Sequence, residues 1–230
     1  MIRIELVPAK PDALRLADYV RSLPDFQVYT TMDGAYDHVG ATVADAILQA
    51  NRKYAVFVKP RVNRILREYP SARTTSAVLA LLQNTETTAF LGVRDATRAA
   101  RVEQVLALFA SEAVETETDL RDWLLQRDGG ARLRTITGIG PKTADYFKIL
   151  VGIPESAIDR HLFGFLRVAG VDSGNYEAAQ ATINAAADLL GVNWALFDHS
   201  IWQYMSQRAQ AARITTGQAR RHNPACAGGA

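Results

Sequence analysis

The sequence has a single cysteine, Cys226, which lies in a C-terminal segment rich in Gly and Ala. One thiol builds neither an internal disulfide nor a cysteine-ligated zinc or iron–sulfur site. No apolar run approaches the ~20 residues that cross a bilayer, and the N-terminus MIRIELVPAK lacks the apolar block of a signal peptide. We therefore expect a protein of the cytosol that carries no cluster and has no membrane partner.

An excess of charge of one sign is also absent. The 26 Lys and Arg residues are opposed by 24 Asp and Glu residues, which leaves a formal net charge of +2. This balance neither requires nor excludes a polyanionic partner. Arginines recur three or four apart in two runs, which are Arg61, Arg64 and Arg67, and Arg94, Arg98 and Arg101. Such runs are usually a solvated surface, so they carry little weight alone.

Alternating strand patterns are rare, and apolar residues instead recur three and four apart. This spacing predicts helices over 12–22, 38–50, 55–68, 75–83, 97–110, 119–127, 141–151, 160–169, 175–190 and 193–209. A hairpin of 3–6 with 26–31 would be marginal. The sequence predicts an all-α fold followed by a disordered tail at 216–230, where GQARRHNPACAGGA loses apolar periodicity.

The segment TGIGPKTADYFKIL, residues 137–150, is the most informative. Gly138 and Gly140 bracket Ile139 in a turn too tight for most side chains, because only glycine adopts positive φ without steric cost. Pro141 suits the first position of a following helix. A turn of this kind presents backbone N–H groups to a phosphate oxygen and would position DNA without reading its sequence. A plain connector between two packed helices is the alternative.

Lys142 falls in the first turn of that helix, where a cation is disfavoured by roughly 0.3 to 1 kcal/mol. Partial desolvation would further lower the pKa of the amine and enlarge the neutral, nucleophilic fraction. A solvated lysine that touches phosphate or nothing is the alternative.

Asp159 can return to Lys142. The helix carries the chain roughly 14 Å away, and the seven residues 152–158 can span about 23 Å. Asp159 also precedes an apolar stretch, where Asp is a favoured helix N-cap. Capping and electrostatic stabilisation of a positively charged sugar are compatible roles.

Together, TGIGPKTADYFKIL and SAIDRHLFGFL (156–166) resemble the helix-hairpin-helix and Gly/Pro…Asp signature of the DNA glycosylase superfamily that includes endonuclease III and 8-oxoguanine glycosylase. The resemblance is clearest over 133–170 and extends to the helix that ends in ILQAN, 47–51. The four cluster-ligating cysteines of endonuclease III are absent, so the chain is more similar to members without the iron–sulfur cluster.

The resemblance implies that Lys142 attacks the sugar C1′ and forms a Schiff base, and that Asp159 is the essential aspartate. The DNA contacts that it implies are phosphate binding by Gly138, Ile139 and Gly140, further contacts by Thr143, Arg160 and His161, and filling of the flipped nucleotide's gap by Gln49 or, alternatively, Asn51. It requires no metal, although it allows a monovalent cation held by hairpin carbonyls. A role for His161 in the core is an alternative.

The resemblance also implies two helical lobes with DNA in the groove between them. One lobe would be 38–150, ending in the hairpin, and the other 1–37 with 151–215. The implied activity is excision of a damaged base from double-stranded DNA, with AP lyase activity through the lysine. A monofunctional glycosylase that uses water activated by Asp159 and a non-enzymatic DNA-binding module stay open.

We expect a monomer that is cytoplasmic and associated with the nucleoid. Spacing alone does not identify the base pocket or the damaged base. The aromatic candidates for the pocket are Tyr29, Tyr36, Tyr54, Trp194 and Trp202.

Overall fold

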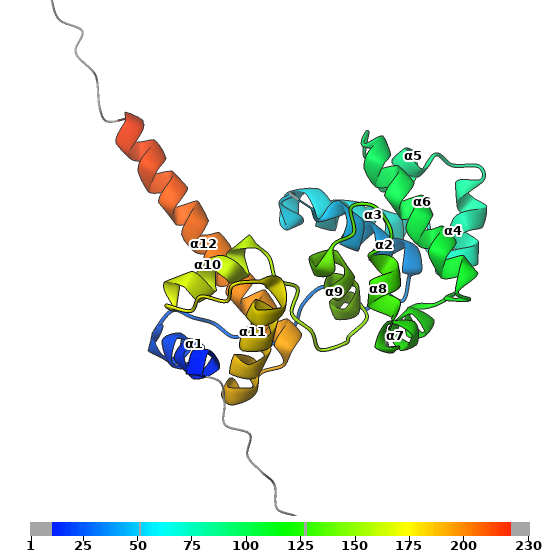
Figure 1. Cartoon of the computed structure of the whole chain (residues 1–230). Coiled ribbons are helices and arrows are strands. Elements are labelled where there is room, and N and C mark those ends of the chain that lie inside the picture. Colours follow the sequence, from blue (N-terminus) through cyan, green and yellow to red (C-terminus); the bar gives the residue numbers. More distant parts are fainter. Residues whose placement is uncertain (1–10, 51, 127, 222–230) are drawn as a thin grey trace, which may run out of the picture. The chain divides into compact units, whose positions relative to one another are not determined.

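The computed structural model describes residues 11–50, 52–126 and 128–221, with side chains up to Gln210. Every regular element within these residues is a helix, which confirms the prediction of an all-α fold (Figure 1). The chain divides into two compact units. We call Met32–Ala157 the central unit, and Met1–Thr31 together with Ile158–Ala230 the terminal unit.

The central unit contains eight α-helices and a short π-helix among its described residues. In chain order these are α2 (Val39–Leu48), η1 (Tyr54–Val58), α3 (Lys59–Glu68), α4 (Thr75–Leu82), α5 (Thr87–Leu91), α6 (Ala96–Ser111), α7 (Glu117–Leu125), α8 (Gly129–Leu133) and α9 (Pro141–Leu150).

Helix α2 forms the core of this unit. All ten of its residues are buried, and it packs against α3, α4, α6 and α9. Its sequence, VGATVADAIL, has no polar face, as expected for a helix surrounded by protein. The helix begins after His38, whose Nδ1 accepts from the N–H of Ala41. One charged residue, Asp45, is therefore carried into the middle of the core.

The helices of the central unit differ from the predicted ones in two ways. The predicted helix 55–68 starts as η1 and continues as α3, because Pro60 has no N–H to bond the carbonyl four residues earlier. The short helices α5 and α8 were not predicted. Gly129 lies in α8, where a Cβ would collide with the carbonyl of Trp123.

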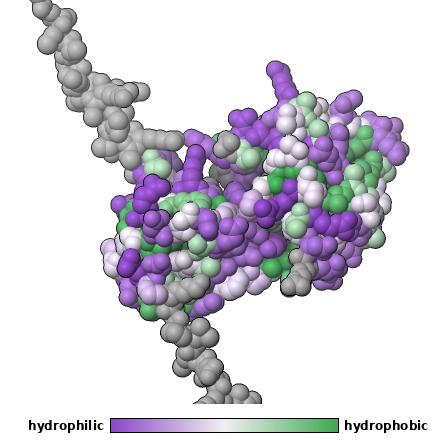
Figure 2. Space-filling model, viewed as in Figure 1, coloured by the Kyte–Doolittle hydropathy of each residue, from purple (hydrophilic) through white to green (hydrophobic). Residues whose placement is uncertain are grey.

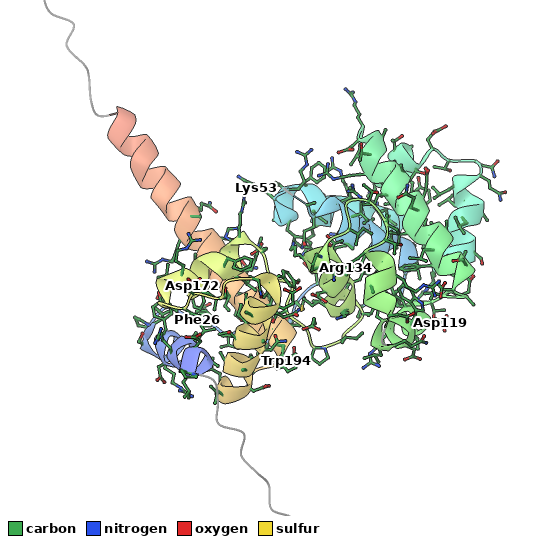
Figure 3. All side chains as sticks on the ribbon, in the orientation of Figure 1. Phe26, Lys53, Asp119, Arg134, Asp172 and Trp194 are labelled. Carbon is green, nitrogen blue, oxygen red and sulfur yellow. The ribbon has the colours of Figure 1, made fainter. Side chains whose placement is uncertain are left out.

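The terminal unit contains α1 (Pro11–Ser22), α10 (Arg160–Val168), α11 (Tyr176–Leu190) and α12 (Trp194–Arg221). Phe26, which is labelled in Figure 3, packs its ring 5.7 Å from Phe165 and 5.4 Å from Tyr204, measured between ring centres. The hairpin of 3–6 with 26–31, which the sequence marks as marginal, has no strand at 26–31. The proposed partner, 3–6, lies outside the described residues.

Helix α12 runs to Arg221, well past the predicted end at 209 and into the segment predicted to be disordered. Gln, Ala and Arg dominate this stretch and favour a helix, and Gly217 alone does not end it. The rest of the predicted tail, 222–230, lies outside the described residues.

The boundaries of the units also differ from the predicted lobes. The central unit extends from 38–150 to 32–157, because the N–H of Ala35 donates to the carbonyl of Leu150 at 2.8 Å. Val151 and Ile153 are buried in the core of the same unit.

The visible surface is mainly hydrophilic, with hydrophobic patches scattered between (Figure 2). In the part of the chain that the structure describes, no helix combines the length and the apolar character needed to span a membrane.

Candidate active site

Lys142 lies in the first turn of α9, directly after Pro141, as the sequence predicts. Its Nζ donates to Oε1 of Gln49 at 2.8 Å and lies 5.6 Å from the centre of the Tyr146 ring. Gln49 is the C-terminal cap of α2. Because α9 packs against the buried α2, residues 93 positions apart in sequence are brought together.

A buried carboxylate continues this polar cluster. Oδ2 of Asp45, a residue with 0% exposure, accepts from the hydroxyl of Tyr36 at 2.6 Å and from that of Tyr54 at 3.2 Å. Its Oδ1 accepts from the hydroxyl of Tyr146 at 3.3 Å. Three hydroxyl donors replace the water that the carboxylate loses on burial. Tyr146 therefore lies between Lys142 and Asp45.

We define the lysine cluster as Lys142, Gln49, Tyr146, Asp45, Tyr36 and Tyr54. Burial raises the pKa of Asp45 to about 6, although the hydrogen bonds from the tyrosines act in the opposite direction. Burial and the nearby Asp45 carboxylate raise the pKa of the Tyr36 and Tyr54 hydroxyls, which stay protonated and continue to donate. The charge of Asp45 therefore changes near pH 6, inside a cluster that includes an amine.

Sequence reasoning did not identify Asp45 or Tyr146. A lone aspartate in the apolar stretch VGATVADAIL was the available signal for the first residue. Tyr146 follows Lys142 by four positions, which places both on one face of a helix. Tyr36 and Tyr54 were named only among five aromatic candidates for a base pocket.

The turn between α8 and α9 matches the prediction in part. Gly138 has φ +87°, a conformation that favours glycine, as predicted. Gly140 instead has φ −95° and ψ −177°, which is extended backbone open to any residue, and a Cβ there would meet nothing within 4 Å. The expectation that Gly140 needs positive φ is therefore wrong, because this residue serves as the N-cap of α9.

Ile139 contributes to the core and not to an outward surface. Its side chain is 4% exposed, and its N–H donates to the carbonyl of Ile136 at 3.0 Å. The amide of Ile139 is thus bonded within the turn, and phosphate binding by the turn stays a prediction. Thr143 lies half-buried in the first turn of α9, where helix N–H groups point beyond the helix.

An arginine covers this turn. Arg101, from α6, donates its Nε to the carbonyl of Thr137 at 2.9 Å. A Cβ at Gly138 would meet the same guanidinium, which can shift as the end of a flexible side chain, so it is the positive φ that favours glycine here. One carbonyl of the turn is thus already bound by a cationic side chain. The monovalent cation stays a prediction.

Asp159 is the N-cap of α10, which confirms the predicted capping role. Its carboxylate accepts from the N–H groups of His161 at 2.7 Å and Leu162 at 3.2 Å. Lys142 belongs to the central unit and Asp159 to the terminal unit. The meeting of their side chains at one sugar stays a prediction.

Of the remaining predicted DNA contacts, Arg160 and His161 do not belong to the lysine cluster. Arg160 is exposed in the first turn of α10. The ring of His161 is half-buried and lies edge-on to Trp202, with 6.0 Å between ring centres. Asn51 lies outside the described residues. The preceding Ala50 carbonyl accepts from Arg98 at 2.8 Å, which fixes the chain directly after Gln49.

Two of the remaining aromatic candidates belong to the packing of the terminal unit. Trp194, labelled in Figure 3, donates its Nε1 to Asp188 at 2.7 Å. Tyr29 lies edge-on to His199, with ring centres 5.2 Å apart. No group of three or more His, Cys, Asp or Glu side chains suited to a metal occurs among residues 11–50, 52–126 and 128–210.

The fold and the cluster define a class: an all-helical protein in which a lysine and a buried acid share one polar cluster. A family model described as a domain of unknown function (DUF8548) matches residues 15–206, and the chain belongs to this family. The matched region contains the whole lysine cluster as well as Asp159. No curated protein matches the chain.

Proposed function

We propose that this protein is a DNA glycosylase of the helix-hairpin-helix superfamily with associated AP lyase activity. The observation that supports this most directly is the hydrogen bond from Lys142 Nζ to Gln49 Oε1. The resemblance assigns Lys142 to attack on the sugar and Gln49 to the space that a flipped nucleotide vacates. These two roles require the residues to lie at one place, and they do.

On this proposal the two units are the two lobes, and the turn between α8 and α9 is the DNA-binding hairpin. Gly138 keeps the turn tight, and the first turn of α9 offers N–H groups to a phosphate. The partner is double-stranded DNA with a damaged base, bound by a monomer in the nucleoid. No metal or cluster takes part.

The reaction begins when the damaged nucleotide leaves the stack, at a cost of a few kcal/mol that is lowest for damaged or mismatched bases. The N-glycosidic bond breaks, and its electron pair leaves with the base. The ionised Asp159 stabilises the positive charge that develops on the sugar. The neutral amine of Lys142 forms a bond to C1′ and passes a proton to the departing base, directly or through Asp159.

The sugar ring then opens, and the adduct becomes a protonated imine. Loss of a proton from C2′ expels the 3′ phosphate, which cuts the strand. Water hydrolyses the imine and releases Lys142 unchanged. In this scheme Gln49 and the Tyr146 ring hold the amine in position, because an amide oxygen accepts both from an amine and, more strongly, from an ammonium group.

Single-lesion duplexes, covering oxidised purines, oxidised pyrimidines and alkylated bases, test the proposal. We expect strand cleavage without added alkali for one class. Cleavage that needs alkali would identify a monofunctional glycosylase that activates water. Binding without base release from any duplex would contradict the enzyme and favour the DNA-binding module.

A further inference from the structure

An arginine-lined hollow lies in the central unit, apart from the residues of the lysine cluster. It has a volume of about 720 Å³ and is bordered by η1, the start of α3, the end of α5 and the loop before α6. Arg52, Arg61 and Arg94 line it together with Phe57. We call it the arginine hollow.

The guanidinium of Arg61 is held in place from three directions. Its Nε donates to the carbonyl of Gly92 at 3.1 Å, and its Nη1 donates to the carbonyl of Phe57 at 2.7 Å. The Phe57 ring centre lies 3.9 Å from this guanidinium and 4.8 Å from that of Arg52. Two cations are thus oriented by one aromatic ring before any ligand arrives.

Positive charge in the hollow is not balanced by its own lining. Among the described residues that line the hollow, Asp95 is the one acid, and it forms an ion pair with Arg98. Within residues 11–50, 52–126 and 128–210, no carboxylate pairs with Arg52, Arg61 or Arg94. Three like charges around one hollow repel each other unless an anion enters.

The chemistry of the lining favours a phosphate. Guanidinium groups match the oxygens of phosphate with paired N–H donors, and a phosphate has enough oxygens to engage more than one arginine. A single carboxylate has only two oxygens and would leave the third arginine without a partner.

We infer that the arginine hollow binds a phosphate group, carried by a nucleic-acid strand or free in solution. This site lies beyond the proposed reaction and does not require Lys142 to react. The side chains of Arg52 and Arg94 are exposed in this hollow, whereas that of Arg61 is half-buried and held by backbone carbonyls.

Binding of undamaged duplex DNA over a range of salt concentrations tests the inference. The double variant Arg52→Ala/Arg94→Ala is compared with Arg67→Ala, a surface arginine of α3 that pairs with Glu68 outside the hollow. If a strand supplies the phosphate, loss of this one phosphate contact in the double variant reduces the slope of log K against log salt by about 0.9 and weakens binding about tenfold near 0.1 M salt. Arg67→Ala should match the wild type.

Titration with inorganic phosphate, followed by calorimetry, separates the two sources. Phosphate binding that is lost in the double variant, with an unchanged DNA slope, identifies a free phosphate ligand. If both measurements are unchanged in the double variant, or if polyglutamate competes as well as phosphate does, the inference is wrong. The binding assay uses undamaged DNA, so its result does not depend on base excision. If the wild type excises no damaged base but the double variant has a reduced salt slope, the proposed function is wrong and the inference about the arginine hollow stands.

Discussion

The two ends of α9 each carry a lysine, and the two lysines have different partners. Lys142, in the first turn, contacts the amide of Gln49 and the ring of Tyr146. Lys148, in the last turn, donates to Asp145 at 2.9 Å and to Glu155 at 3.2 Å. The same side chain on the same helix is thus placed among different groups.

Two carboxylates fix Lys148 as a cation. Burial lowers the pKa of Lys148, but Asp145 and Glu155 outweigh this effect, and the pKa is raised overall. Lys148 therefore serves as a structural ammonium that ties α9 to the segment after it. Lys142 instead shares its cluster with Asp45, whose charge changes near pH 6. Under the proposed function, the first end of α9 carries the reacting amine, whereas the last end carries an ion pair that stabilises the fold.

The largest effect is expected at Asp45. Its pKa rises on folding from an ordinary 3.8 to about 6, so the folded state holds the proton more tightly. The resulting stabilisation is complete below pH 4 and is lost as the pH rises through 6. Two pKa units correspond to about 3 kcal/mol. Urea unfolding from pH 4 to 7 should show the wild type losing about this much relative to Asp45→Asn. Parallel curves would contradict the assignment.

Removal of Lys148, in the last turn of α9, should reduce the free energy of unfolding by a smaller amount. Lys148→Met leaves Asp145 and Glu155 without their shared cation, and we expect about 2 kcal/mol of destabilisation, reduced from the buried limit because the side chain is partly exposed. Lys142→Met should change the free energy of unfolding by less than about 1 kcal/mol. Chemical denaturation of both variants checks this order. Equal losses would remove the contrast between the two lysines.

A smaller change in the free energy of unfolding is expected at Asp159, where two variants separate the capping role from the role of the negative charge. Asp159→Ala should destabilise the protein by about 1 kcal/mol through loss of the N-cap, whereas Asp159→Asn keeps the cap. If the carboxylate also stabilises a sugar cation, Asp159→Asn still loses base excision while its unfolding curve matches the wild type. Full excision by Asp159→Asn would leave capping as its role.

The fold was largely readable because apolar residues recur three and four apart along the longer helices, a signal that is local in sequence. The helix ends were less exact. Helix α7 begins at Glu117, directly after the capping box of Thr116 with Asp119, which is labelled in Figure 3, and not at the predicted 119. Helices α5 and α8 have five residues each, which is too short for an apolar period to be recognised.

The residues of the candidate site could be predicted only where they belong to a short sequence motif. The turn and the capping aspartate follow from short segments, so Gly138, Lys142 and Asp159 could be identified. The contact between Gln49 and Lys142 depends on how α2 packs against α9, and the tyrosines around Asp45 come from three separate segments. Contacts between residues so far apart in sequence cannot be predicted from a local sequence pattern. The arginine hollow was missed for the same reason.

Borohydride trapping on a single-lesion duplex tests the central claim most directly, because it records a bond between one lysine and the sugar. Lys142→Gln and Lys148→Gln, two variants of one helix, are compared with the wild type at a temperature at which all three are folded. The account predicts a covalent protein–DNA adduct with the wild type and with Lys148→Gln, and none with Lys142→Gln. An adduct that persists in Lys142→Gln, or its absence from the wild type with every lesion, would contradict it.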